Sequence, residues 1–460
     1  MGSTRTRRRG VVAVYTALFM VVLLGVAAIV VDMGALYRRR IIAQRCADAA
    51  ALAGAWQLAH FQAKPYADTM AKYYASLPEN GGYVDGTNSA AVTVEYPAKD
   101  ESGVTRNNWY RITVRRPEKT FFASSFRRNA EIAATATAIY TTLAPINIKG
   151  LGTYGTAPGP VNLSVFGPNG RYGYGDCYST KYLNDGVSKN PDYNPKGYDF
   201  LITVPKTYKG TTLEIYDPDC YNPNGPDSGN GQVDEYRKQN GDTGTVLDAT
   251  VTQYALYDDH GTPNNPDDDG LPIAIKSYGA DITTDGKWVN FYTGDRSLLP
   301  NSNFRLNVVS TAGSSENGFD LRIGPTRTGS QAFDPNNGTA IAADGHLPMN
   351  FNQSGTVKIA LGTLPVEAAG GTVDIRKFDT DVGAKSITYS CSSLPGYVFP
   401  AGTLSADGKF ATDTLNVPAS YTTAGTWYAE YQAGTGDTSV WDMSYSNAGP
   451  GRPGTIKLIR

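Results

Sequence analysis

The sequence predicts an α+β fold that continues as an all-β body: a long N-terminal membrane-anchored helix with a small antiparallel sheet, followed by two β-sandwich domains. Three observations support this fold class. An uncharged apolar run lies near the N-terminus, alanine-rich sequence without proline follows it, and short alternating segments separated by turns fill the remainder. The 460 residues include 50 Gly, 27 Pro and 30 Tyr with 18% charged residues, a composition typical of short strands and many turns.

The apolar run covers residues 11–31 and contains no charged side chain. At about 1.5 Å per residue a helix of this length is about 31 Å long, close to the hydrocarbon thickness of a bilayer. We interpret it as an uncleaved transmembrane helix. The alternative is a cleaved secretory signal, whose apolar region is shorter and ends at a small-residue cleavage site. Here a charged, helix-forming continuation follows instead.

Charge and size together suggest an orientation. Four arginines lie in the basic stub, residues 1–10, and three more at residues 38–40, so charge alone is nearly balanced. Because only a short stub precedes the helix, we expect a cytoplasmic N-terminus and extracytoplasmic C-terminal domains. Residues 1–128 carry 18 Lys and Arg against 9 Asp and Glu, and the rest carries 23 against 34. An acidic distal part argues against nucleic acid as a partner.

Residues 32–142 predict a helix packed on a small antiparallel sheet. Alanine loses no side-chain entropy in a helix, so the first helix is expected to continue to about His60. Pro65 suits the start of a second helix that ends near Leu77. Period-two alternation over residues 91–96 and 109–115 predicts a hairpin, and residues 132–140 predict a third strand.

The distal part predicts two β-sandwich domains. A Pro/Gly-rich linker at residues 143–160 precedes a jelly-roll-like sandwich at residues 161–325, and a second linker at 326–349 precedes an immunoglobulin-like sandwich at 350–460. The strands expected in the first sandwich are residues 161–166, 198–204, 211–216, 250–257, 288–292, 304–309 and 319–323. Those of the second are residues 355–361, 372–378, 386–391, 410–417, 425–431 and 440–445, and the tail at 447–460 has TIKLI as a further edge strand.

Two loops of the first sandwich are rich in Asp and Asn. Calcium prefers six to eight oxygen ligands, which such loops supply, so the sequence predicts a calcium site. The alternative interpretation is a set of solvated turn residues. A true EF-hand does not fit, because Lys276 stands where its last loop position requires glutamate. The candidate metal ligands are Asp217, Asp219, Asp258, Asp259, Asp267 and Asp269, with Asn264 and Asn265 in the same loop.

The chain has four cysteines and three histidines. Cys177 and Cys220 are a candidate disulfide in an exported protein, although spacing does not prove pairing, whereas Cys46 and Cys391 are expected to be unpaired buried thiols. The sequence lacks a nucleophile elbow, a phosphate-binding glycine loop and an H-E-x-x-H motif, so we predict no enzymatic activity. Trp427 and Trp441 are candidate faces for stacking on carbohydrate.

Several motifs near the N-terminus resemble the TadE/TadG-like family, the membrane-anchored pilin-like proteins of the Tad (Flp pilus) assembly system. They are the Arg8-Arg9-Gly10-Val11 entry, Val31-Asp32-Met33-Gly34 with Tyr37, and the alanine-rich 47–53 segment. The TFFA motif at residues 120–123 and the alternating segment after it are similar to the end of the family's conserved region. The resemblance covers roughly residues 7–140.

One departure from the family pattern concerns processing. Prepilin-like members carry a glutamate five residues into the apolar segment after a glycine, and here Tyr15 takes its place after Gly10. The chain therefore resembles the larger TadG type, a retained anchor with a distal cargo. The resemblance implies a non-enzymatic component of a pilus or secretion apparatus in the cytoplasmic membrane, with other Tad/Flp components as partners. The alternative is a tethered, calcium-dependent module that binds a surface ligand or carbohydrate.

Overall fold

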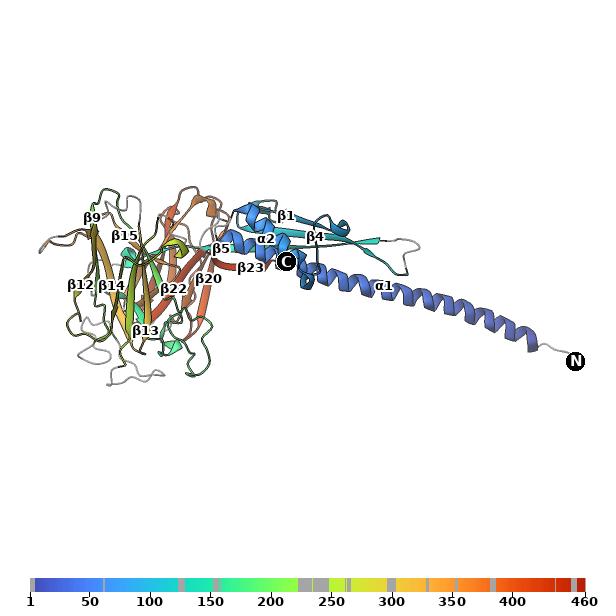
Figure 1. Cartoon of the computed structure of the whole chain (residues 1–460), viewed down its shortest axis with the longest axis horizontal. Coiled ribbons are helices and arrows are strands. Elements are labelled where there is room, and N and C mark those ends of the chain that lie inside the picture. Colours follow the sequence, from blue (N-terminus) through green and yellow to red (C-terminus); the bar gives the residue numbers. More distant parts are fainter. Residues whose placement is uncertain are drawn as a thin grey trace. The chain divides into compact units, whose positions relative to one another are not determined.

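The computed structural model contains two compact units, each described by itself. It describes residues 5–60, 63–122, 129–151, 157, 159–221, 234, 248–260, 262, 266–295, 303–327, 331–351, 355–380, 386–434, 436–447 and 453–459. Unit 1 comprises Met1–Thr141 and Gly449–Arg460, and unit 2 comprises Thr142–Ala448. The predicted long apolar helix and the largely β body with several antiparallel sheets are both confirmed (Figure 1).

Unit 1 is a helix pair packed on an antiparallel sheet, as predicted. The sheet has the order β1-β4-β5, and β23, which contains the predicted TIKLI strand, pairs with β5. Val92 faces Val114 across the predicted hairpin, and Ile112 faces Ala136 on the other side of β4. The elements are α1 (Arg5–Ala59), α2 (Lys64–Ser76), η1 (Pro78–Asn80), η2 (Thr87–Ser89), β1 (Ala91–Glu95), β2 (Ala98–Lys99), β3 (Thr105–Arg106), β4 (Trp109–Lys119), β5 (Asn129–Leu143) and β23 (Pro453–Ile459).

Small side chains let the second half of α1 approach its neighbours closely. The buried alanines of α1 face the buried Ala67, Ala71 and Ala75 of α2, and the same cluster includes Tyr110 and Ile112 of β4. Alanine side chains are small, so they exclude water from this contact while the backbones of the helices and the sheet stay close together. The buried residues of α1 are Ala43, Cys46, Ala47, Ala50, Ala51, Ala55, Leu58 and Ala59.

Gly54 of α1 lies directly against Tyr110 of β4. A Cβ atom added there would lie 2.0 Å from Cε1 of Tyr110, whose ring is fully buried. We therefore expect Gly54→Ala to destabilise unit 1 by about 1–3 kcal/mol, the usual cost of overpacking. Hydrogen exchange of the α1 and β4 amides measures this loss. Gly25→Ala is the matched control, since nothing lies within 4 Å of a Cβ at Gly25. Equal exchange in both variants would contradict the prediction.

The described residues of unit 2 form three antiparallel sheets of distinct order. The largest runs β20-β18-β22-β16-β7-β14-β9-β12, a second runs β11-β10-β13-β8-β15-β6, and the third runs β17-β21-β19. All thirteen strands predicted for the two sandwiches form. The elements are β6 (Ile146–Asn147), η4 (Ile148–Leu151), β7 (Val161–Phe166), η5 (Tyr172–Tyr174), β8 (Tyr198–Thr203), β9 (Gly210–Tyr216), β10 (Val251–Asp258), η7 (Pro266–Asp268), β11 (Ala274–Tyr278), β12 (Trp288–Asp295), β13 (Phe304–Ala312), β14 (Glu316–Pro325), β15 (Ala340–Asp344), β16 (Leu347–Phe351), β17 (Gly355–Leu364), η9 (Val366–Ala368), β18 (Thr372–Phe378), β19 (Ile387–Cys391), β20 (Phe410–Asn416), β21 (Gly425–Ala433) and β22 (Asp437–Tyr445).

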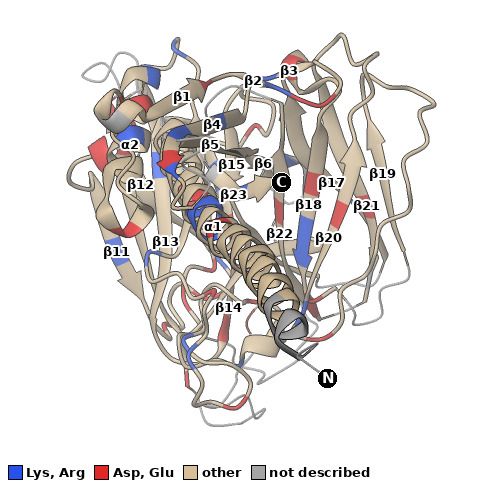
Figure 2. Cartoon of the chain, turned by 90° about the vertical axis from the view of Figure 1, so that its right-hand side faces the viewer, with Lys and Arg blue, Asp and Glu red and all other residues tan. Residues whose placement is uncertain are grey.

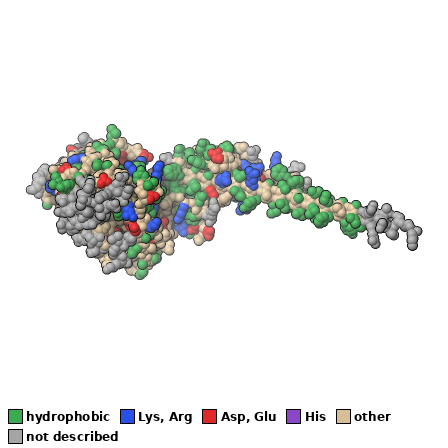
Figure 3. Space-filling view, turned by 90° about the horizontal axis from the view of Figure 1, so that it is seen from below, with side chains coloured by type: hydrophobic (Ala, Val, Ile, Leu, Met, Phe, Trp, Pro, Cys, Tyr) green, Lys and Arg blue, Asp and Glu red, His purple; other side chains and the backbone are tan. Residues whose placement is uncertain are grey.

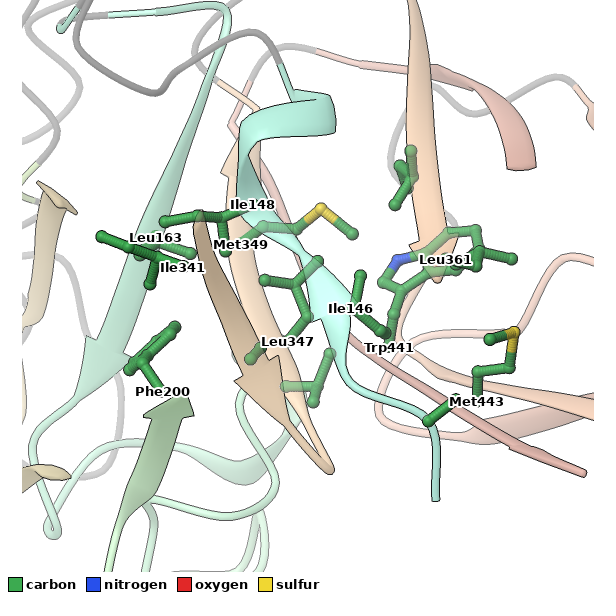
Figure 4. Packing of buried hydrophobic residues seen from close by; sticks show 14 of the residues in the cluster. Ile146, Ile148, Leu163, Phe200, Ile341, Leu347, Met349, Leu361, Trp441 and Met443 are labelled. Carbon is green, nitrogen blue, oxygen red and sulfur yellow. The ribbon is translucent and has the colours of Figure 1, made fainter. Parts of the chain in front are cut away.

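The two predicted sandwiches form one unit, and the predicted linkers supply strands to it. Strand β16 begins in the predicted linker 326–349 and inserts between β7 and β22, so that Met349 faces Leu163 and Leu347 faces Trp441. Strand β6 lies in the predicted linker 143–160 and pairs with β15. Ile146 and Ile148 are buried there in a single core with side chains from both predicted sandwiches (Figure 4). The apolar side chains within these turn-rich stretches make them part of the core.

Candidate functional site

The N-terminal half of α1 presents apolar side chains to its surroundings. From residue 11 to residue 31 its large hydrophobic side chains are exposed, including Leu24 at 67% and Val22 at 62%. Figure 3 shows these hydrophobic side chains along the helix, and Figure 2 shows the same stretch without charge. Among the described residues, α1 is the one helix long and apolar enough to cross a membrane, and its apolar stretch is not buried in the protein. An apolar helix of this exposure suits lipid as its surroundings.

Asp32 joins the end of this span to the segment that follows β4. Its carboxylate is 5% exposed and accepts hydrogen bonds from the backbone N–H of Phe121 at 2.8 Å and of Phe122 at 3.1 Å. A buried carboxylate is stabilised by such charge-assisted bonds. Two motifs of the resemblance, the VDMG segment and the TFFA segment, are therefore in direct contact through Asp32.

Asp217 and Asp219 lie together against the loop that precedes β12. Asp217 Oδ1 accepts a hydrogen bond from Gly286 N at 3.0 Å. Asp219 accepts bonds from Asp281 N at 2.8 Å and from Thr284 Oγ1 at 2.6 Å. Both side chains are fully buried, and within the described part of the chain Asp217 Oδ2 has no hydrogen-bond partner. The pair therefore offers buried carboxylate oxygen, which is the donor type that calcium prefers.

The other predicted metal ligands have different partners. Asp258 accepts a bond from His260 N, and Asp259 accepts one from Asn303 N. Asp269 forms a buried ion pair with Arg305 at 2.6 Å, and Asp267 is exposed in η7. Asn264 and Asn265 lie outside the described residues. No group of three or more His, Cys, Asp or Glu side chains suited to a metal occurs in the described part of the chain.

Sequence reasoning missed Asp234, a further buried carboxylate beside Asp217. It is 2% exposed and accepts a hydrogen bond from Gly318 N at 2.8 Å. Burial, and then the charge of Asp217, raises its pKa well above the usual value for aspartate. Burial raises the pKa of Asp217 to about 8, with Asp219 and Asp285 adding to it, and burial raises the pKa of Asp219 to about 6. No local pattern around Asp234 indicates its position, because long-range folding brings it there.

These raised pKa values predict a pH dependence of stability for unit 2. A carboxyl that binds its proton more tightly in the folded state contributes most below the unfolded pKa of about 3.9 and loses that contribution as pH rises. We expect the free energy of unfolding in EDTA to fall between about pH 4 and pH 8, the folded-state pKa of Asp217. Denaturant titration of the full chain measures this slope. Asp217→Asn should reduce this slope, with Asp219 and Asp234 responsible for the remainder, whereas an unchanged slope in that variant would contradict the assignment.

The structure corrects two predicted sites. Cys177 and Cys220 are separate buried free thiols, so the predicted disulfide is not formed; Cys177 lies in the core and Cys220 Sγ donates to Glu316 O. Trp427 and Trp441 are fully buried, so neither presents a face to a sugar. Both tryptophans belong to the buried core, which their large aromatic rings fill. Cys46 and Cys391 are buried free thiols, as predicted.

His346 lies in a cluster that sequence reasoning did not identify. Its ring stacks on Tyr178 with centroids 3.9 Å apart, and its Nδ1 lies 3.2 Å from Asp442 Oδ2. Arg376 donates to the Tyr178 hydroxyl at 3.0 Å. These residues come from four distant parts of the chain, so no local motif indicates the cluster.

Comparisons with solved structures give only distant similarities. A protein from Parabacteroides distasonis described as secreted is 8% identical, with 67% of this chain and 89% of that chain covered and a TM-score of 0.15. The tandem CBM22 domains of Paenibacillus barcinonensis Xyn10C are 11% identical, with 78% and 94% covered and a TM-score of 0.15. The structure of infectious bursal disease virus, Gx strain, is 13% identical, with 70% and 76% covered and a TM-score of 0.13. Such TM-scores do not indicate a shared fold.

Comparison with curated proteins gives no match. Comparison with protein families gives a match over residues 10–57, which contain the apolar span, Asp32 and the alanine-rich part of α1. The matched model describes the TadE/G-like proteins of Flp pilus assembly. The N-terminal segment of this chain, residues 10–57, thus matches the TadE/G-like Flp pilus-assembly family, and over these residues the resemblance seen in the motifs is confirmed.

Proposed function

We propose that the protein is a non-enzymatic, membrane-anchored component of a Tad/Flp-type pilus assembly or secretion system. The observation that supports this most is the match at residues 10–57, which coincides with an exposed apolar helix of membrane-spanning length. In this proposal the N-terminus is cytoplasmic and the β body of unit 2 acts outside the cytoplasmic membrane, in assembly or adhesion. Its partners are the membrane and other Tad/Flp components.

Fractionation of cells that express the full chain with a C-terminal accessibility tag tests this proposal. The tag should stay with carbonate-washed membranes and be labelled by a reagent that does not cross the membrane. A matched chain with the tag at the N-terminus is the control and should resist labelling in intact cells. A gene deletion without any effect on pili or secretion would contradict the assembly role.

A second candidate function is a tethered calcium-dependent binding module, supported by the burial of Asp217 and Asp219. Both carboxylates are 0% exposed, and the free energy cost of burying an isolated charge is high. Each carboxylate therefore favours either a bound proton or a bound cation. Calcium would supply the neutralising charge, with Asp217 and Asp219 as ligands. The module would then recognise a surface ligand or carbohydrate.

Thermal unfolding of the full chain at about pH 8, with calcium or with EDTA, tests the second candidate. Calcium at a hundredfold excess over its Kd should stabilise the folded state by about 2.7 kcal/mol. Asp217→Asn should abolish that stabilisation, whereas Asp267→Asn, an exposed carboxylate in η7, should retain it. Equal unfolding temperatures with calcium and with EDTA would contradict calcium binding.

A further inference from the structure

Unit 1 carries an unexplained surface beside the point where α1 loses its apolar character. We call this surface the juxtamembrane face. It consists of Phe121 and Phe122 together with the neighbouring groove lined by Arg38, Arg39, Arg116, Glu118 and Lys119. Asp32 is the first charged residue after the apolar span, and it holds the backbone of both phenylalanines. The Lys119 end of β4 therefore lies level with the end of the span. If α1 is the anchor, as the proposed function requires, this face lies at the bilayer surface.

The two phenylalanines of this face are exposed although their side chains are apolar. Phe121 is 67% exposed and Phe122 is 59% exposed, and Asp32 fixes the backbone of both. Aromatic side chains concentrate at membrane–water interfaces, where an apolar ring enters the boundary between headgroups and acyl chains. Two adjacent rings at the end of a transmembrane span match that location.

A basic groove adjoins the phenylalanines. Its cavity has a volume of about 1080 Å³, and its lining includes Arg38, Arg39, Arg116 and Lys119; among the described lining residues, Glu118 supplies the one carboxylate. Glu118 is shared between Arg116 at 2.8 Å and Arg39 at 3.8 Å. The lining therefore keeps a positive charge, and the exposed Arg38 and Lys119 extend it to the surface. Figure 3 shows Lys and Arg side chains gathered where the bare helix meets the rest of unit 1.

The height of the groove matches the headgroup layer. Arg38 is six residues beyond Asp32, or about 9 Å along the helix. Side chains on a helix lean toward its N-terminus, which here is the membrane end, and arginine stems reach several ångströms further. The headgroup region of one leaflet is about 5–8 Å thick. The guanidinium groups of α1 therefore reach phosphate depth.

We propose that the juxtamembrane face binds the anionic phospholipids of the membrane that α1 crosses, with a headgroup phosphate in the basic groove and Phe121 and Phe122 at the interface. Charge complementarity and continuity with the transmembrane span select lipid as the occupant. The contact fixes the tilt of unit 1 on the membrane, because it adds a second attachment beside α1.

Depth measurements on the full chain in nanodiscs test the apolar half of the proposal. A fluorophore on Phe122→Cys should be quenched by lipids that carry a nitroxide near the headgroup. The same fluorophore on Ser102→Cys is the control, because Ser102 lies in the β2–β3 turn near the opposite end of β4 and should not be quenched. The four native cysteines are buried and give little background. Equal quenching at both positions would overturn the proposal.

Lipid retention in native mass spectrometry tests the basic half. The full chain should retain phosphatidylglycerol in preference to phosphatidylcholine, and Arg38→Gln with Lys119→Gln should weaken retention about fivefold for each charge removed. Lys64→Gln with Lys99→Gln is the control of equal charge change, because both residues lie near the far end of unit 1. Equal retention in the two pairs would overturn lipid binding and favour a protein partner for the groove. Loss of the chain from the membrane in every variant would instead contradict the anchor, and so the proposed function itself.

Discussion

A chain that carries Leu23→Arg together with Leu24→Arg is expected to leave the membrane fraction almost completely. Both side chains lie near the middle of the apolar span and are exposed, at 48% and 67%. Arginine at the centre of a transmembrane helix costs about 2.5–3.5 kcal/mol on insertion scales, so two of them offset the favourable transfer of the span. Immunoblots of carbonate-washed membranes and of the soluble fraction measure the redistribution.

The matched control for this experiment is Leu23→Ala together with Leu24→Ala. It shortens the same side chains without adding charge, so the chain should stay in the membrane. N-terminal sequencing of the unsubstituted chain distinguishes an uncleaved anchor from a cleaved secretory signal. A cleaved chain would lack residues 11–31, and neither pair of substitutions would then be present in the mature protein. An arginine variant that remains in the membrane would show that another part of the chain holds it there.

The sequence predicted the elements of unit 1 well because their patterns are local. Alanine without proline indicates a helix over residues 47–59, and alternation indicates β1 and β4. The partner of each element is not a local property. That Gly54 meets Tyr110, and that Asp32 meets Phe121, follows only from packing over long sequence separations.

The boundaries in unit 2 are harder to predict because two of the strands in the predicted linkers, β16 and β6, show no alternation. All five residues of β16 are buried, and one of them is Pro348, so the segment has neither period two nor high strand propensity. The two-residue β6 is too short for any periodicity. Turn-rich composition therefore suggests linkers in segments that in fact form paired strands. For this reason the sequence predicts two separate cores where unit 2 has one.

The candidate site was predictable only in part. The Asp217 and Asp219 pair lies at the end of a predicted strand, so local sequence found it. Asp234, and the separation of Asp258 and Asp259 from that pair, depend on loop geometry that residue types do not encode. One further signal is present in the sequence: Lys377 follows Val373 and Ile375 at the inward-facing positions of β18. A cation at an inward position of a strand indicates a buried ion pair.

Lys377→Met is expected to destabilise unit 2 by about 3–5 kcal/mol, because it leaves a buried carboxylate without its counter-charge. Lys377 is fully buried and pairs with Asp413 of β20, and Tyr389 of β19 donates to the same carboxylate at 2.5 Å. Burial alone would raise the pKa of Asp413, but the bonds from Lys377 and Tyr389 hold that pKa below its usual value. Stability from this group is therefore present above about pH 3.9 and lost as pH falls through the lower folded pKa. Denaturant titration of the full chain measures the change.

The double variant Lys377→Met with Asp413→Leu distinguishes the contribution of the ion pair from the contribution of side-chain packing. Replacing both charges by apolar side chains of similar size removes the unpaired carboxylate, so most of the lost stability should return. Lys358→Met is the surface control and should change the free energy of unfolding by less than about 0.5 kcal/mol, because Lys358 is exposed on β17. The three strands that meet at this group belong to two different sheets, with β18 and β20 in one and β19 in the other. If the single and double variants lose equal stability, the packing of the Lys377 stem, and not its charge, holds these two sheets together.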